Sequence, residues 1–68
     1  MKSLNKKLGE KLKEVRIAKG LSQGDIAKKL NVHRSYISGI ERGVRNPTIK
    51  NVGKLAYALG IDPHNLLK

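Results

Sequence analysis

The chain of 68 residues is long enough for one small domain, and its 15 Lys and Arg against 5 Asp and Glu give a formal net charge of +10, which favours a polyanion as partner. Cysteine is absent, which excludes disulfides and thiolate metal sites, and the distance in sequence between His33 and His64 argues against a histidine centre, so we expect no metal and no cofactor. The longest apolar run, residues 55–59, is too short to cross a membrane, and the lysine-rich N-terminus lacks the apolar segment of a secretory signal. We therefore expect a cytoplasmic protein. We also expect a single domain over residues 1–68.

The first predicted helix covers residues 4–19 and ends at Gly20, a residue type that tolerates the left-handed conformation of a helix end. Leu8, Leu12 and Val15 are spaced to lie on one face of this helix. We expect that face to be buried and the lysines around it to be solvated.

Two short predicted helices follow, with a turn of three residues between them. The first is Gln23–Leu30, with Ser22 placed to cap it, and the second covers residues 34–42. Ala27 is small at the point where two crossing helices need to approach closely. Two short helices joined in this way are typical of a helix-turn-helix, here over about residues 23–42.

The fourth predicted helix is Ile49–Leu59 and the fifth is the short Pro63–Leu67, whose proline suits a first helical position. We expect the apolar residues of the fourth helix to face inward: Ile49, Val52, Leu55, Ala56 and Leu59. No segment alternates with the period of a strand for long enough to form one. The predicted fold is therefore all-α, a compact arrangement of five helices.

The outward residues of segment 34–42 can donate and accept hydrogen bonds, and none is a carboxylate: Arg34, Ser35, Ser38, Gly39 and Arg42. Arginine can donate two hydrogen bonds to guanine, and serine can donate or accept, so these types suit the base edges of DNA. The alternative is an ordinary solvated helix face, although such a face normally mixes charges of both signs.

Neighbouring residues allow two interpretations each. Tyr36 either packs at the edge between the two short helices or contacts a phosphate or a thymine methyl group. Gly39 either lets the backbone approach the wall of a groove or is merely tolerated, at a cost of about 1 kcal/mol relative to alanine. We expect His33 to be a turn residue near the phosphates.

Phosphate contacts are predicted at two helix starts, because free amides and partial positive charge gather there. Gln23 is the first residue of its helix and could add its side-chain amide. A basic loop, with Arg42, Arg45 and Asn46, opens onto the start of the fourth helix.

Two further expectations concern contacts within the protein or between two copies of it. We expect Arg16 and Glu41 to form an ion pair that fixes the third helix against the first. The C-terminal apolar residues either form a dimer contact or close the core of the monomer: Tyr57, Ile61, Leu66 and Leu67.

The chain resembles the Cro/phage-repressor class of helix-turn-helix proteins, the XRE family, over about residues 8–67. The resemblance lies in Leu12-x-x-x-Arg16, Gly20-Leu-Ser-Gln23-x-x-Ile-Ala27, Ser35-Tyr-Ile-Ser-Gly-Ile-Glu-Arg-Gly43, Arg45-Asn-Pro-Thr48 and Leu55-Ala-x-Ala-Leu-Gly-Ile-Asp-Pro63. It implies a lambda-repressor-like fold of five helices, with the third as recognition helix in the major groove, and dimers on palindromic operators.

The resemblance also implies roles for single residues. Base-facing positions fall on Arg34, Ser35 and Ser38, with Tyr36 beside them. A phosphate-contacting glutamine falls on Gln23, the family's buried ion pair falls on Arg16 and Glu41, and backbone-contacting positions fall on Arg42, Arg45 and Asn46. The segment 33–43 with Arg45 and Asn46 looks especially like the controller proteins of restriction–modification systems. Gly24 and Gly39 depart from the family pattern.

These observations predict a sequence-specific transcriptional regulator that binds a double-stranded DNA operator as a homodimer. One alternative is the antitoxin of a toxin–antitoxin pair, which would bind a protein partner as well. Another is a non-specific basic protein that binds RNA or an anionic surface through its charge alone. With 5 carboxylates and no cysteine, no acid–base pair or metal cluster can be assembled from the sequence, so we expect no enzyme.

Overall fold

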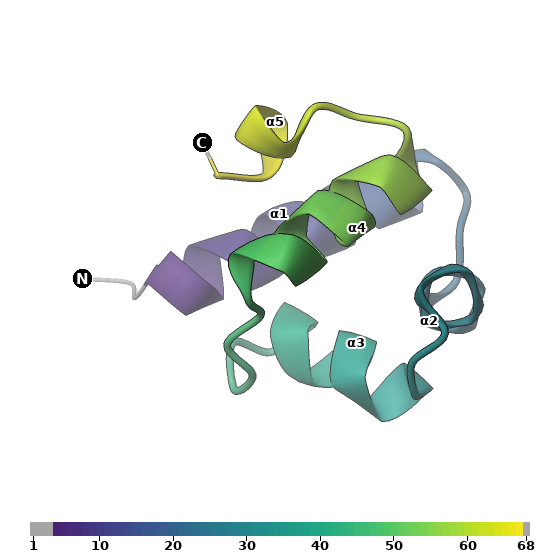
Figure 1. Cartoon of the computed structure of the whole chain (residues 1–68), viewed down its shortest axis with the longest axis horizontal. Coiled ribbons are helices and arrows are strands. Elements are labelled where there is room, and N and C mark those ends of the chain that lie inside the picture. Colours follow the sequence, from purple (N-terminus) through teal and green to yellow (C-terminus); the bar gives the residue numbers. More distant parts are fainter. Residues whose placement is uncertain (1–3, 68) are drawn as a thin grey trace.

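Five helices make up the secondary structure of residues 4–67, which are the residues that the computed structural model describes (Figure 1). They are α1 (Leu4–Ala18), α2 (Gln23–Leu30), α3 (Arg34–Glu41), α4 (Ile49–Leu59) and α5 (Pro63–Leu67). No strand occurs within this range. The all-α prediction is confirmed, and the predicted helix ends agree to within one residue; residues 1–3 and 68 of the expected domain lie outside the described range.

Side chains at the helix starts make the hydrogen bonds that the sequence predicts. At α2 the Asp25 amide donates to Ser22 Oγ (2.9 Å) while the Ser22 amide donates to Asp25 Oδ2 (2.8 Å), a complete capping box. At α4 the Asn51 amide donates to Thr48 Oγ1 (3.1 Å). Each bond satisfies an amide that a helix start otherwise leaves free.

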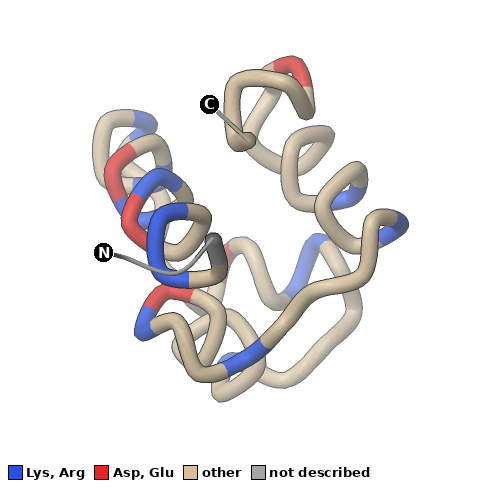
Figure 2. Tube along the Cα trace, turned by 90° about the vertical axis from the view of Figure 1, so that its left-hand side faces the viewer, with Lys and Arg blue, Asp and Glu red and all other residues tan. Residues whose placement is uncertain are grey.

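The helices form a closed ring around the core. α1 packs on α3, α3 on α2, α2 on α4, α4 on α5, and α5 returns to α1. In Figures 1 and 2, α3 lies at the bottom of the molecule and α5 at the top, with α1 and α4 between them. The ring encloses the largest fully buried side chains: Leu12, Ile26, Ile37, Ile40, Leu55 and Leu66.

The crossing of α1 and α3 depends on a glycine in α1. A Cβ atom on Gly9 would overlap the carbonyl oxygen of Ile40. Only glycine therefore allows the two backbones to approach as they do, and this contact holds α3 firmly on the rest of the molecule.

Two expectations about burial are wrong. Ile49 is 91% exposed although it lies on the same side of α4 as the buried Ala56, because it is the first residue of the helix and the buried residues of α4 begin only at Val52. Leu66 is 1% exposed and belongs to the monomer core, so it cannot be part of the predicted dimer contact. It points inward because α5 closes the ring between α4 and α1.

Candidate nucleic-acid interface

The turn between α2 and α3 is short and well ordered by its backbone. Asn31 adopts the left-handed conformation (φ 59°) that ends α2, and the Val32 amide donates to the Ala27 carbonyl at 3.0 Å. Val32 is half-buried against the core. His33 is the N-cap of α3, and its side chain, which makes no capping bond, is exposed.

α3 has one face in the core and one in solvent. Ile37 and Ile40 are fully buried, whereas Arg34 and Ser35 are exposed and Ser38 is half-buried. The outward face carries donors and hydroxyl groups and no carboxylate, because Glu41 turns toward α1. This face can therefore meet a polyanion without electrostatic repulsion.

Tyr36 lies on the flank of α3 that faces α4. Its ring is partly buried against the core, and its hydroxyl accepts a hydrogen bond from Asn51 Nδ2 at 2.6 Å. The structure thus gives Tyr36 a packing role and a fixed hydroxyl together. Sequence reasoning missed Asn51; the signal was a polar residue beside the buried arc of α4.

The loop after α3 folds back onto the end of that helix. The amides of Val44 and Arg45 both donate to the Gly39 carbonyl, at 3.0 and 3.1 Å. A Cβ atom on Gly39 would lie 2.5 Å from Arg45 Cγ. Gly39 is therefore not merely tolerated, because it makes room for the side chain of Arg45, while its approach to the wall of a groove stays a prediction.

This packing places a basic loop beside the outward face of α3. Three residues of the loop region expected to contact phosphates are exposed: Arg42, Arg45 and Asn46. The loop ends at the N-terminus of α4, where the helix dipole adds partial positive charge. The arrangement offers cations and helix amides on one side of the molecule.

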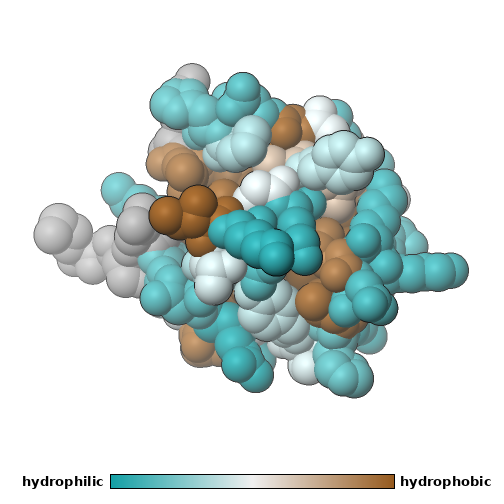
Figure 3. Space-filling view, viewed as in Figure 1, coloured by the Kyte–Doolittle hydropathy of each residue, from teal (hydrophilic) through white to brown (hydrophobic). Residues whose placement is uncertain are grey.

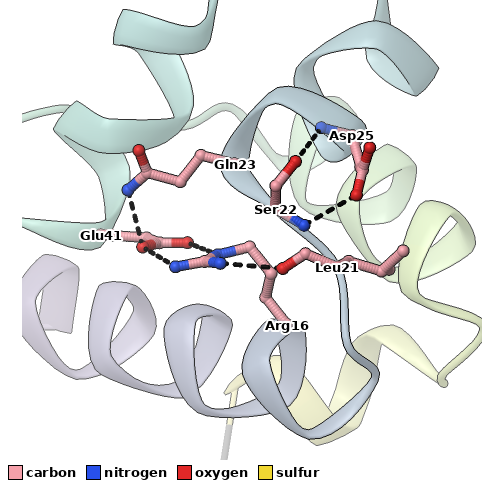
Figure 4. A network of polar contacts seen from close by, with 6 residues as sticks. All are labelled: Arg16, Leu21, Ser22, Gln23, Asp25 and Glu41. Atoms are coloured by element: carbon pink, nitrogen blue, oxygen red, sulfur yellow. Dashed lines mark hydrogen bonds and ion pairs between the residues drawn. The ribbon is translucent and has the colours of Figure 1, made fainter.

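Arg16, Glu41 and Gln23 join three helices in one polar network (Figure 4). Arg16 donates to both carboxylate oxygens of Glu41, at 2.6 and 3.1 Å, and to the Leu21 carbonyl at 2.9 Å. Gln23 Nε2 donates to Glu41 Oε1 at 3.0 Å. The side chain of Glu41 is 3% exposed, so this carboxylate is fully paired away from water.

Two pKa shifts follow from these contacts. The hydrogen bond to Glu41 raises the pKa of Arg16 above its ordinary value, against the opposing effect of burial. The Ser22 amide, helped by the Ser22 hydroxyl, lowers the pKa of Asp25. Both groups are charged at neutral pH. Charged Arg16 holds the end of α3 through Glu41, and charged Asp25 caps the start of α2.

The network changes what Gln23 can offer a phosphate. One amide hydrogen of its side chain is used by Glu41, which leaves the second hydrogen and the backbone amides of the α2 start. The phosphate contact of Gln23 stays a prediction, and Gln23 also links the start of α2 to the end of α3.

Lys and Arg are spread over several elements of the described chain. Figure 2 shows Lys and Arg along α1 and α4 and in the loop between α3 and α4, with few acidic residues between them. An open groove of about 630 Å³ between α2 and α4 adds Lys29, Lys50 and Lys54 around an apolar floor. In Figure 3 hydrophilic side chains flank exposed apolar surface on this side.

Of the proposed dimer residues, Leu67 lies on α5, at the opposite end of the molecule from α3 (Figure 1), whereas Tyr57 lies on α4 and lines the groove between α2 and α4. Tyr57 is 89% exposed and Leu67 is 53% exposed, while Ile61 packs partly against the core. Within residues 4–67 no three potential ligands gather that could hold a metal ion. No helix in the described part of the chain is long and apolar enough to span a bilayer.

The two short helices, their turn and the basic loop define a helix-turn-helix protein, and comparison with known families agrees. The chain belongs to the HTH_3 helix-turn-helix family, of the XRE type, whose model matches residues 12–66. This is a family of DNA-binding regulators, and the resemblance seen in the sequence is confirmed.

Among individual proteins the chain is similar to controllers of restriction–modification systems. It is 43% identical over 60 residues to control protein C.BamHI of Bacillus amyloliquefaciens, covering 87% of this chain and 74% of the relative. It matches the crystal structure of C.AhdI from Aeromonas hydrophila with a TM-score of 0.88 and 48% identity, over 91% of this chain and 94% of that one.

A third match is the controller protein C.Esp1396I, solved as a tetramer with its natural 35 base-pair operator. Its TM-score is 0.82 at 36% identity, and all of both chains is covered. Other curated relatives, described as transcriptional regulators, are longer, and the chain spans about half of their length.

Proposed function

We propose that this protein is a sequence-specific DNA-binding transcriptional regulator that inserts α3 into the major groove of an operator. The observation that carries the proposal is the outward face of α3, where Arg34 and Ser35 are exposed, Ser38 is half-buried and no carboxylate opposes them. Arg34 and Ser38 are four residues apart and so lie on one line along the helix. Side chains so placed can reach base edges together.

Contacts to the sugar-phosphate backbone hold the recognition helix in register. The loop residues Arg42, Arg45 and Asn46 and the start of α4 bind phosphates on one side of the groove. The start of α2, at Gln23, binds them on the other side. The net charge of +10 adds a general attraction to DNA that salt screens.

The protein acts as a homodimer on a palindromic operator. Two recognition helices then enter successive major grooves, roughly 34 Å apart. The dimer contact is the exposed apolar surface of Tyr57 and Leu67 with the half-buried Ile61. Burying such a surface in a second copy removes apolar area from water.

Control of a restriction–modification system is the role that the similar proteins favour. C.BamHI and C.AhdI are both controllers, and C.Esp1396I is seen as a tetramer on its own operator. We propose that this chain binds its operator in the same general manner, with dimers placed side by side on the DNA.

Selection of bound sites from a random DNA pool tests the proposal. The expected result is an enriched site with two inverted half-sites whose centres are about one helical turn apart or a multiple of it. Recovery of unrelated sequences with no enriched motif would contradict the proposal and support a basic protein that binds nucleic acid through charge alone.

A further inference from the structure

Asn51 occupies a capping position in α4 but uses its side chain elsewhere. In α2 the corresponding residue, Asp25, closes a capping box by accepting a hydrogen bond from the Ser22 amide. In α4 the Asn51 amide donates to Thr48, yet the side chain of Asn51 does not return to the Thr48 backbone. It reaches across to α3 and donates from Nδ2 to the hydroxyl of Tyr36 at 2.6 Å.

The direction of this bond decides what the Tyr36 hydroxyl can do. A tyrosine hydroxyl can donate one hydrogen bond and accept others. Because the Asn51 amide donates, the hydroxyl accepts and keeps its own proton for a further partner. The ring is held against the core, so the hydroxyl is fixed relative to both α3 and α4.

DNA supplies suitable partners for that proton. Phosphate oxygens, guanine N7 and O6, adenine N7 and thymine O4 all accept hydrogen bonds. Tyr36 is the third residue of α3, on the flank that also carries Gly39 and, above it, the side chain of Arg45. An acceptor bound at this flank can take the proton that the Tyr36 hydroxyl keeps.

We propose that Asn51 is a positioning residue for operator binding: it orients the Tyr36 hydroxyl as a hydrogen-bond donor to an acceptor on the DNA. The inference rests on the proposed function and extends it to a residue of α4 that need not touch DNA. It also couples the start of α4 to the recognition helix.

A double-mutant cycle tests this role, with wild type, Asn51→Ala, Tyr36→Phe and the double variant. Each binds the duplex selected from the random pool and an unrelated duplex of equal length, at one salt concentration. Tyr36→Phe weakens binding to the selected duplex about tenfold and Asn51→Ala about threefold to fivefold, the range expected for one hydrogen bond. The double variant binds no more weakly than Tyr36→Phe, because Asn51 acts only through that hydroxyl.

The matched control is Asn65→Ala, which removes an exposed asparagine from α5 and leaves both affinities unchanged. Additive losses in the double variant would overturn the positioning role. So would an equal loss on both duplexes for Asn51→Ala, since a general weakening of the fold or of charge attraction affects both alike.

Asn51→Asp separates positioning from a structural role. An aspartate here can complete the capping box as Asp25 does, so the melting temperature does not fall. A carboxylate cannot donate to the Tyr36 hydroxyl, so the hydroxyl loses the partner that positions it as a donor and the selected duplex binds at least as weakly as with Asn51→Ala. When Asn51→Asp is combined with Tyr36→Phe, the new carboxylate can only repel phosphates, so it should weaken binding to both duplexes equally. A loss of affinity for the selected duplex alone in this double variant would contradict the inference.

The experiment separates two failures. If wild type discriminates between the two duplexes but the cycle is additive, the role of Asn51 is wrong and the proposed function stands. If wild type does not discriminate, the proposed function is wrong and the inference falls with it.

Discussion

Glu41 shows how one buried carboxylate organises the surface that we propose faces DNA. It accepts hydrogen bonds from Arg16 on α1 and from Gln23 on α2, and its own side chain is 3% exposed. The carboxylate thereby neutralises Arg16 and keeps its own charge off the outward face of α3. A single residue therefore both positions the recognition helix and keeps its outer face free of negative charge.

Removing Glu41 should destabilise the protein strongly. Glu41→Ala leaves the half-buried Arg16 guanidinium without its counter-charge, and breaking such a pair costs about 3 kcal/mol of unfolding free energy. Chemical denaturation measures this loss. Glu14→Ala, an exposed glutamate on α1, is the control and should change stability by less than about 0.5 kcal/mol. Equal effects of the two substitutions would contradict the role of the network.

Two helical glycines should respond to alanine in opposite ways. A Cβ atom on Gly39 meets Arg45 Cγ at 2.5 Å, whereas nothing lies within 4 Å of one on Gly53. Gly53→Ala should stabilise the protein by about 0.5–1 kcal/mol, the ordinary gain of alanine in a helix. Gly39→Ala should not show this gain and should weaken DNA binding several-fold, because Arg45 is displaced. Thermal unfolding and duplex binding of both variants check this, and a matching gain at Gly39 would count against the explanation.

The positions of the helices were the feature of this molecule that the sequence predicted best. Side chains that cap, at Ser22 and Thr48, and the left-handed Asn31 act within a few residues, so their effects can be predicted from local sequence. Ile49 was predicted wrongly because periodicity alone does not show how far along a helix the buried face extends.

Contacts between helices could not be predicted in the same way. The bond from Asn51 to Tyr36 and the approach of Gly9 to Ile40 join segments that are distant in sequence. They depend on the angles and distances at which the helices cross, and a local sequence pattern does not predict these. The sequence therefore predicted which residues belong to the candidate site. It did not predict the contacts between helices that hold those residues in place.

The capping box of α2 should make stability depend on pH. Hydrogen bonding to Ser22 lowers the pKa of Asp25 in the folded protein below its ordinary value of 3.8. The carboxylate therefore stabilises the fold above that pH, and its contribution is lost as the pH falls through the lower folded pKa. The melting temperature of Asp25→Asn should fall below that of wild type at neutral pH, and the difference should shrink in acid. A difference that persists unchanged at the acid end would contradict the assignment.

At the scale of the whole molecule, the ring of helices separates two surfaces. α3 and the basic loop lie at the opposite end of the molecule from α5 (Figure 1). The exposed Leu67 on α5 is therefore placed to pair with a second copy while α3 faces the proposed operator. In the proposed dimer, association and DNA binding reinforce one another, because two half-sites are bound at once.

Tyr57→Asp should weaken self-association at least about tenfold, since large aromatic residues dominate such contacts. Binding to a palindromic duplex should weaken with it, while the melting temperature of the monomer stays unchanged because the side chain is 89% exposed. Ile49→Asp introduces the same charge on α4 at a side chain that is 91% exposed, and should leave association intact. Sedimentation equilibrium measures both, and equal loss in the two variants would contradict the assigned dimer contact.

The most direct measurement compares wild type and Arg34→Ala on the selected duplex and on an unrelated duplex at the same salt concentration. If α3 reads bases, Arg34→Ala should cost about 1–3 kcal/mol on the selected duplex and far less on the other. A loss of equal size on both duplexes, or no loss on either, would show that the outer face of α3 does not recognise sequence.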